Sequence, residues 1–316
     1  MLDDAAARVG KRTGARPAHA VRQRARAGIE RTERRAGVAL VSPAVAAIVL
    51  TSIAPLVLAF GFSLTDYNLL QPPRWVGLRN YVGILGDPVF WKALENTLAF
   101  AFSQVAIGIV VAVLVALLFN GWLYGGALMR TFVYLPQAAS YVVIALVWTM
   151  LLDPMTGPIN RMLTAGGGSP VYFLSDPAWA MASIVVMSMW RNLGYFMIII
   201  LAALKSVPDE LLEAAAIDGA GPIRRFFYVT LPTIRGVLSF VAITWFLGAL
   251  QMFTQAYVMT GGGPVNATRT VVYLMYDEAF TNLNIGAASA MAVMLFLLVV
   301  ALSLILRLVL RRKEES

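Results

Sequence analysis

The chain has 316 residues, of which 59% are apolar and 13% charged, and its formal net charge is +8. Because soluble domains carry roughly 25% charged residues, this composition predicts an integral membrane protein. The absence of cysteine excludes disulfides, thiolate metal sites and cysteine nucleophiles, and a single histidine, His19, leaves no histidine cluster for a metal. Without a DNA- or RNA-binding motif, the basic balance does not indicate a nucleic-acid partner.

Residues 1–36 form a basic arm rich in Ala and Arg, which we expect to be disordered and attracted to anionic lipid headgroups. Six apolar windows follow, each longer than the roughly 20 residues that cross a bilayer. They are 37–64, 94–120, 126–152, 178–204, 234–260 and 285–310. The first is too long for a cleavable signal peptide, so we expect it to remain as an anchor. The sequence thus predicts an all-α membrane protein with a six-helix domain over 37–311 and a short tail, 312–316.

The basic residues predict which way the six helices are oriented. Nineteen of the 25 Lys and Arg fall on the side of the two termini, and five fall on the opposite side. The positive-inside rule therefore places both termini in the cytoplasm, together with the polar segment at 205–233.

Pro136 lies inside the third window, where it removes a backbone hydrogen bond and should kink or break the helix. Carbonyls freed at membrane depth are tolerated only where they face protein or a wet cavity. A packing kink and a functional break both fit this residue.

The polar segment at 205–233 predicts a short helix-turn-helix between the fourth and fifth windows. Ser206 and Asp209 have the spacing of a capping box, with Pro208 in the first turn. We expect the first helix to span about eleven residues and to end at Gly219–Gly221, before Pro222. A helix this short is marginal alone in water, so it needs a partner surface. An ordinary helical loop is the alternative.

The same segment resembles the EAA loop of ABC importer permeases, and the residues typical of that loop are all present here. They are Glu213, Ala214, Ala215, Asp218, Gly219, Ala220, Phe226, Leu231 and Pro232. In that family the loop inserts into a cleft of a separate ATPase subunit. Two further runs, 130–163 and 257–280, resemble the carbohydrate-uptake permeases of the maltose type, so that the resemblance spans roughly 42–311.

The resemblance implies a transport subunit in a bacterial cell membrane, with no catalytic residues and no cofactor or metal of its own. Consistently, the chain has no Walker motif for ATP. The implied partners are a second homologous permease, an ATPase dimer that binds ATP and Mg²⁺, a solute-binding protein outside the membrane, and membrane lipid. The run of Gly261, Gly262, Gly263 and Pro264 should end the fifth helix and meet the binding protein, although a plain turn also fits.

Polar and aromatic side chains within the spans are candidates for the solute pathway. On the fourth window Ser188, Asn192 and Tyr195 share a helical face, and a similar stripe occupies the fifth. The full set of candidates is Gln137, Tyr141, Ser188, Asn192, Tyr195, Trp245, Gly248, Ala249, Gln251, Met252 and Gln255. Helix–helix packing is the alternative reading of the aromatic and small residues.

Arg191 has two interpretations, since a charge at membrane depth needs a partner. It could bind an anionic solute, or pair with a carboxylate of a partner subunit, which we favour. The sequence therefore predicts half of an ATP-driven import pathway for a sugar or polyol. A glycerol-phosphate importer is the first alternative, an ion-coupled secondary transporter the second, and a membrane-embedded enzyme or scaffold the third.

Overall fold

The computed structural model describes residue 37 and residues 39–121 and 126–312. The basic arm at 1–36 and residues 313–316 of the tail lie outside the described residues. The chain divides into two units, one ending at Leu58 and the other beginning at Ala59.

The first apolar window forms the predicted helix, over Ala39–Ser63, with a mean hydropathy of 2.3 for its best window. It passes through one π-helical stretch, η1 (Val49–Ile53), into α2 (Ala54–Ser63). None of that window is buried against protein. An apolar helical window that is not buried against protein is suited to a lipid environment.

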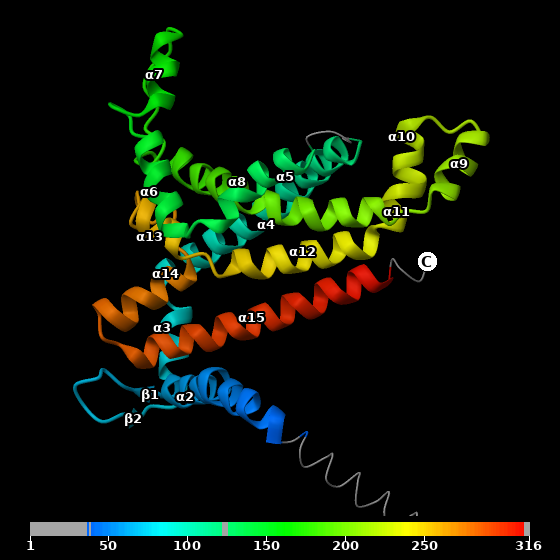
Figure 1. The fold of residues 1–316 in the computed structure, drawn as a ribbon. Coiled ribbons are helices and arrows are strands. Elements are labelled where there is room, and N and C mark those ends of the chain that lie inside the picture. Colours follow the sequence, from blue (N-terminus) through cyan, green and yellow to red (C-terminus); the bar gives the residue numbers. More distant parts are fainter. Residues whose placement is uncertain (1–36, 38, 122–125, 313–316) are drawn as a thin grey trace, which may run out of the picture. The chain divides into compact units, whose positions relative to one another are not determined.

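Long helices make up most of the second unit. They are α4 (Pro88–Asn120), α8 (Pro177–Lys205), α12 (Arg235–Leu250) and α15 (Ile285–Arg312). Both α4 and α8 begin with Pro at the first position and with an N-cap aspartate, Asp87 or Asp176, whose carboxylate accepts a backbone N–H. Helices α4, α8 and α12 contact one another, and α15 packs along α12 (Figure 1).

The third window is interrupted, as Pro136 predicts. It forms α5 (Gly126–Ala138) and α6 (Tyr141–Leu151), which meet at an angle of 100°. Pro136 itself stays inside α5, and the break falls three residues later, where the hydroxyl of Ser140 caps α6. Because α5 ends at the bend, its last carbonyl groups have no partner within the helix and can accept hydrogen bonds from neighbouring side chains.

The prediction for the fifth window was wrong in its extent. Helix α12 ends at Leu250, and a separate helix, α13 (Thr254–Met259), follows the break at 251–253. The hydroxyl of Thr270 donates to the carbonyl of Met252 at 2.7 Å, which satisfies a backbone acceptor within the break. Consequently Gly261–Pro264 does not end the fifth long helix but follows α13.

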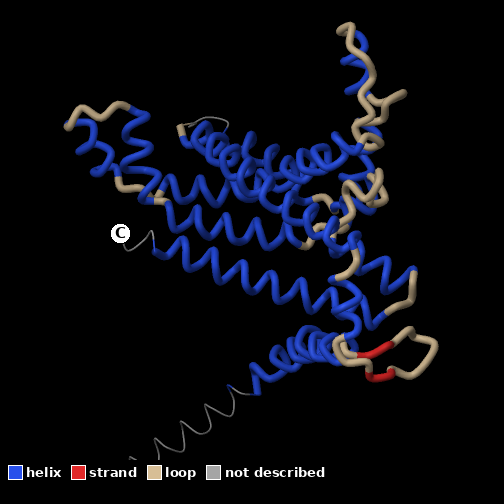
Figure 2. Tube along the Cα trace, turned by 180° about the vertical axis from the view of Figure 1, so that it is seen from behind, coloured by secondary structure: helices blue, strands red, loops and turns tan. Residues whose placement is uncertain are grey.

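The remaining elements are short and connect the long helices. They are β1 (Thr65–Asp66), β2 (Arg74–Trp75), α3 (Arg79–Leu85), α7 (Pro158–Ala165), α9 (Asp209–Ile217), α10 (Pro222–Arg225), η2 (Phe226–Thr230), α11 (Leu231–Thr233), α14 (Val271–Tyr276) and η3 (Asp277–Thr281). The strands pair antiparallel, with Thr65 opposite Trp75 and Asp66 opposite Arg74. This hairpin lies at the end of the second unit opposite α9 and α10 (Figure 2).

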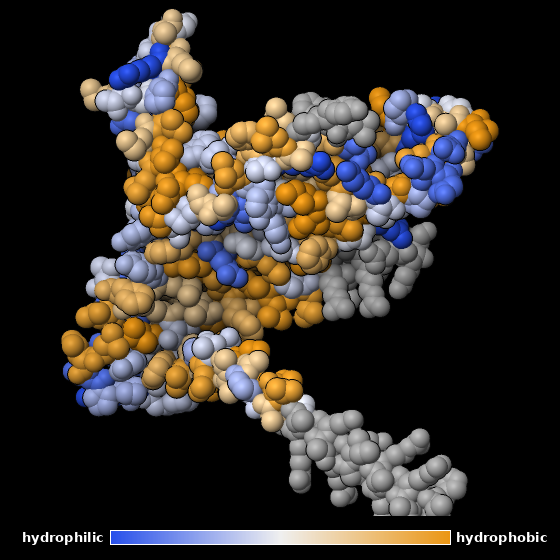
Figure 3. Space-filling view, in the orientation of Figure 1, coloured by the Kyte–Doolittle hydropathy of each residue, from blue (hydrophilic) through white to orange (hydrophobic). Residues whose placement is uncertain are grey.

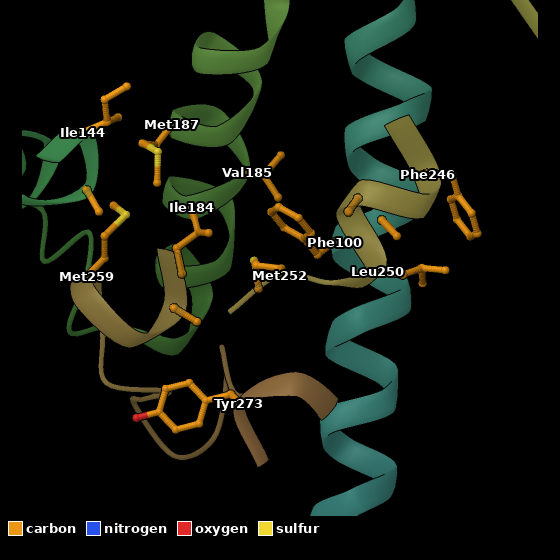
Figure 4. Packing of buried hydrophobic residues seen from close by; sticks show 14 of the residues in the cluster. Phe100, Ile144, Ile184, Val185, Met187, Phe246, Leu250, Met252, Met259 and Tyr273 are labelled. Carbon is orange, nitrogen blue, oxygen red and sulfur yellow. The ribbon is translucent and has the colours of Figure 1, made fainter. Parts of the chain in front are cut away.

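One core cluster joins α4, α6, α8, α12, α13 and α14. Figure 4 shows Met252 among the side chains of Phe100, Ile184 and Leu250, all of them buried. Since Met252 follows the end of α12, the break itself is anchored in this core.

Within the described residues, four helices are long and apolar enough to cross a membrane, and up to six if each bent pair counts as one span. The second bent pair is Pro222–Thr233 with Arg235–Leu250, at 69°. On the face drawn in Figure 3, hydrophobic side chains cover much of the long helices, as lipid contact requires.

Candidate functional site

A cavity of about 270 Å³ lies where α4, α5, α8, α12 and α13 approach the break between α5 and α6. Its walls combine amides, aromatic rings, small residues and one charged side chain. The lining residues are Phe100, Gln104, Gln137, Tyr141, Arg191, Asn192, Tyr195, Phe196, Thr244, Trp245, Gly248, Ala249 and Gln255. A polar cavity inside an apolar helical domain is the feature expected of a pathway or binding site for a hydrophilic solute.

The charged side chain in the cavity wall is Arg191, on α8. It forms hydrogen bonds with the end of α5. Its Nη2 donates to the carbonyl oxygens of Gln137 and Ala139 at 3.3 and 3.1 Å, and its Nε reaches the same Ala139 oxygen at 3.4 Å. Its Nη1 donates to the side-chain oxygens of Gln137 and Asn192 at 3.0 and 3.3 Å. Three of these five hydrogen bonds thus go to backbone carbonyl oxygens at the break, which are free because α5 does not continue, and two go to side-chain oxygens.

Tyr141, the first residue of α6, completes this network. Its ring lies under the Arg191 guanidinium, 3.8 Å from ring centroid to Cζ, a cation–π contact. Its hydroxyl donates to the Asn192 side-chain oxygen at 3.0 Å. The two halves of the broken span are therefore both fixed to α8.

A second wall is aromatic. The rings of Phe196 and Trp245 stack at 4.2 Å with an interplanar angle of 12°. The indole N–H of Trp245 donates to the Gln104 side-chain oxygen at 3.2 Å, and the amide nitrogen of Gln104 donates to the Val185 carbonyl at 2.7 Å. Opposite the indole, a Cβ at Gly108 would lie 2.4 Å from a Trp245 ring carbon, so only glycine fits there. This wall is rigid, because each polar atom in it has a partner.

Eight of the eleven residues predicted for the pathway line this cavity. The other three do not: Ser188 is fully buried, Met252 lies in the core, and Gln251 is exposed beyond α12. The hydroxyl of Ser188 is buried without a hydrogen-bond partner. Sequence reasoning did not single out Phe100, Gln104, Phe196 or Thr244. Gln104 could have been found, since it is the one glutamine within the long apolar window at 94–120.

The helix-turn-helix at 205–233 consists of α9, a tight turn and α10. Gly219 adopts φ of +78°, and the N–H groups of Gly219 and Ala220 donate to the carbonyls of Ala216 and Ala215 at 3.0 and 2.9 Å. These are the two bonds of a Schellman motif, which ends α9 two residues before Gly219. The capping-box prediction was wrong: the Ser206 hydroxyl donates back to the Ala203 carbonyl, and Pro208 occupies the N-cap position.

Most of this segment is open to solvent. No residue of α9 is buried, and Ile217, Ile223 and Tyr228 are exposed by 87%, 74% and 80%. Glu213, Asp218 and Pro232 are likewise exposed. In contrast, Leu212 and Phe226 pack against the core cluster that contains α4, α8 and α12 residues. The segment therefore has one side packed on the core and one exposed side that carries apolar and charged residues.

The loop from Gly261 to Thr270 is held by buried polar side chains. Asn96, on α4, donates to the carbonyls of Asn266 and Arg269 at 2.7 and 2.9 Å, and the buried hydroxyl of Thr268 donates to the Gly263 carbonyl at 2.8 Å. Val265 is 88% exposed at the loop tip. The loop thus presents a fixed backbone at the surface.

Ionisable groups beside this loop are paired. Arg269 forms a salt bridge with Asp277 and also contacts the side-chain oxygen of Asn266. Burial, with the charge of Asp277 as a second cause, raises the pKa of the Tyr273 hydroxyl above its ordinary value. In the part of the chain that the structure describes, no three His, Asp or Glu side chains are grouped as a metal site requires.

Residues 104–315 match a protein family described as the binding-protein-dependent transport system inner membrane component. The chain is 37% identical over 251 residues to the probable ABC transporter permease protein YurN of Bacillus subtilis, covering 77% of this chain and 85% of YurN. It is 37% identical over 233 residues to the sn-glycerol-3-phosphate transport system permease protein UgpA of Yersinia pestis, covering 73% and 79%.

A third relative is the trehalose/maltose transport system permease protein MalF of Thermococcus litoralis, 32% identical over 275 residues, covering 86% of this chain and 92% of MalF. Among solved structures, a bacterial ABC transporter involved in the import of the acidic polysaccharide alginate contains a chain with a TM-score of 0.80. It is 24% identical and covers 91% of this chain and 99% of that chain, which supports a common fold. The three relatives are named as permease proteins, which are transport subunits and not enzymes.

Proposed function

This chain belongs to the inner membrane components of binding-protein-dependent transport systems and is an ABC transporter permease; from this premise we propose that it forms half of an import pathway for a carbohydrate or polyol. The observation that carries the proposal is the cavity at the α5–α6 break. Amides, an aromatic stack and a small-residue wall provide the hydrogen bonds and ring faces by which proteins bind hydroxyl-rich solutes.

The α9–α10 segment is our candidate for the contact with the ATPase. Its exposed face offers Glu213, Asp218 and small residues, Ala214 and Ala216, that permit close approach. Its other face reaches the core through Phe226 and Leu212. A force applied to α9 would therefore reach the helices that line the cavity. ATP and Mg²⁺ would bind to the ATPase subunits, and closure of their dimer would turn the pathway outward.

The remaining assignments follow from topology. We propose six spans, counting each bent pair as one, with both termini and α9–α10 in the cytoplasm, as the distribution of basic residues indicates. A second homologous permease would complete the pathway, with lipid around both. The Gly261–Pro264 loop lies on the opposite side, where its fixed backbone would meet the solute-binding protein.

Glycerol phosphate is the second candidate solute. It is favoured by the relative named for sn-glycerol-3-phosphate transport and by the presence of Arg191 in the cavity wall. Both candidates share the same permease mechanism and differ in the charge of the solute.

The experiment is uptake into proteoliposomes that contain the intact complex, purified through a tag on this chain, with ATP and Mg²⁺ trapped inside and the binding protein outside. We expect accumulation of solute that continues when an ionophore collapses the proton gradient. Accumulation should stop when a non-hydrolysable ATP analogue replaces ATP. Uptake that follows the ion gradient without ATP hydrolysis would instead identify a secondary transporter.

A further inference from the structure

The Arg191 side chain has five N–H donors, one on Nε and two on each terminal nitrogen. It makes five hydrogen bonds, distributed as one, two and two over these atoms. Every donor is therefore used within this chain. A phosphate or carboxylate entering the cavity would find the guanidinium without a free N–H.

The charge of Arg191 is also compensated. Two of its acceptors, the carbonyl oxygens of Gln137 and Ala139, belong to the C-terminal end of α5. The C-terminal end of a helix carries a partial negative charge of about half an elementary charge. Tyr141 covers one face of the guanidinium. The positive potential that reaches the cavity is accordingly weaker than that of an isolated arginine.

The donors that remain free in the cavity are neutral. The amide nitrogens of Gln137 and Asn192 and the side chains of Gln255 and Thr244 have no hydrogen-bond partner within the described residues, and all four residues line the cavity. Arg191 is the one charged residue in the lining. These groups match alternating hydroxyl donors and acceptors on a solute without charge.

We propose that this cavity selects a neutral polyhydroxy solute, such as a sugar or polyol, and rejects phosphate esters and carboxylates. Arg191 is the specificity-determining residue, because its N–H donors are already hydrogen-bonded to Gln137 and Ala139 at the end of α5 and to Asn192 on α8. This inference rests on the proposed function, since it names the solute class of the same cavity. In this proposal Gln137 also has a second role. Its side-chain oxygen accepts a hydrogen bond from Arg191 and so prevents that donor from binding an anion.

The experiment measures equilibrium binding of radiolabelled maltose, trehalose, glycerol and glycerol 3-phosphate to the complex in nanodiscs. The binding protein is first removed by a high-salt wash, because it would impose its own selectivity. The variants are Gln137→Leu and Asn192→Leu, each of which frees one Nη1 donor of Arg191. The matched control is Gln71→Leu, which changes an exposed glutamine in the β1–β2 loop.

We expect the unmodified complex to bind one of the neutral solutes and to leave glycerol 3-phosphate unbound. In Gln137→Leu or Asn192→Leu, glycerol 3-phosphate should gain about tenfold or more in affinity, the effect of one charge-assisted hydrogen bond. The gain should disappear when Arg191→Gln is added, and Gln71→Leu should behave as the unmodified complex.

Binding of glycerol 3-phosphate by the unmodified complex, lost in Arg191→Gln, would overturn the inference while leaving the transport role intact. An absence of any gain in both leucine variants, with neutral solutes still bound, would equally overturn it. If no solute binds and Asn192→Leu or Tyr195→Ala leaves uptake unchanged, the pathway assignment itself fails, and the inference falls with it.

Discussion

Gly194 and Gly248 lie on two helices that line the cavity, yet the space around them differs. A Cβ at Gly194 would lie 2.3 Å from the Val133 carbonyl oxygen, because α5 crosses α8 at this residue, whereas nothing lies within 4 Å of one at Gly248. Gly194 therefore permits helix packing, and Gly248 leaves room in the cavity.

Gly194→Ala should destabilise the protein by about 1–3 kcal/mol, the usual effect of overpacking against backbone. Gly248→Ala should leave stability unchanged or raise it by up to about 1 kcal/mol, since alanine favours the helix. However, the added methyl group should reduce solute uptake. Thermal unfolding in detergent, monitored by size-exclusion chromatography, checks both expectations. A Gly194→Ala protein as stable as the unmodified one would contradict the close crossing of α5 and α8.

Individual residues also show which parts of the candidate site could be predicted from the sequence. Helical spacing placed Asn192 and Tyr195 on one face, and both line the cavity. The role of Arg191 was not predictable, because four of its five hydrogen bonds go to Gln137 and Ala139, more than fifty positions away, and the backbone carbonyls among these acceptors become free only at the 100° bend. Tertiary packing determines which oxygens a partly buried arginine contacts, and the amino-acid composition does not predict these contacts.

At the scale of elements, apolar composition predicted where spans exist better than where they end. The window at 234–260 is apolar on average, although Gln251, Thr254 and Gln255 lie at or next to the break, so mean hydropathy alone does not reveal the break after Leu250. That break is stabilised by Thr270, eighteen residues from its acceptor on Met252. A local signal worked at Pro136, close to the α5–α6 break, but the local capping-box spacing of Ser206 and Asp209 did not predict the N-cap of α9.

The turn between α9 and α10 provides a test at this scale. Gly219→Ala places a side chain at φ of +78°, which costs roughly 1–2 kcal/mol for a non-glycine residue. Gly221→Ala is the matched control, since Gly221 has φ of −67° and open space around it. We expect the first variant to lower recovery of the ATPase subunit by a factor of about 5 to 30, and the second to have no effect. Equal recovery from both would argue against a docking role for this turn.

For the whole molecule, the family and the helical architecture were both predicted, and the comparisons confirm the family. The prediction of the family rested on a resemblance in one short loop and two further runs of the sequence. The cavity was harder to predict, because its walls combine side chains of six helices, α4, α5, α6, α8, α12 and α13. No single helix of the sequence contains enough of it to be recognised alone.

Co-purification of the tagged chain with its partner subunits from mild detergent tests the claim that this permease receives its energy through α9. Glu213→Lys reverses a charge on the exposed face of α9, and Glu95→Lys, near the start of α4, is the matched control. We predict that the unmodified chain and Glu95→Lys recover an ATPase subunit and a second permease. Glu213→Lys should keep the permease, lose the ATPase and lose ATP-driven uptake. Full recovery of an active ATPase with Glu213→Lys would contradict the claim.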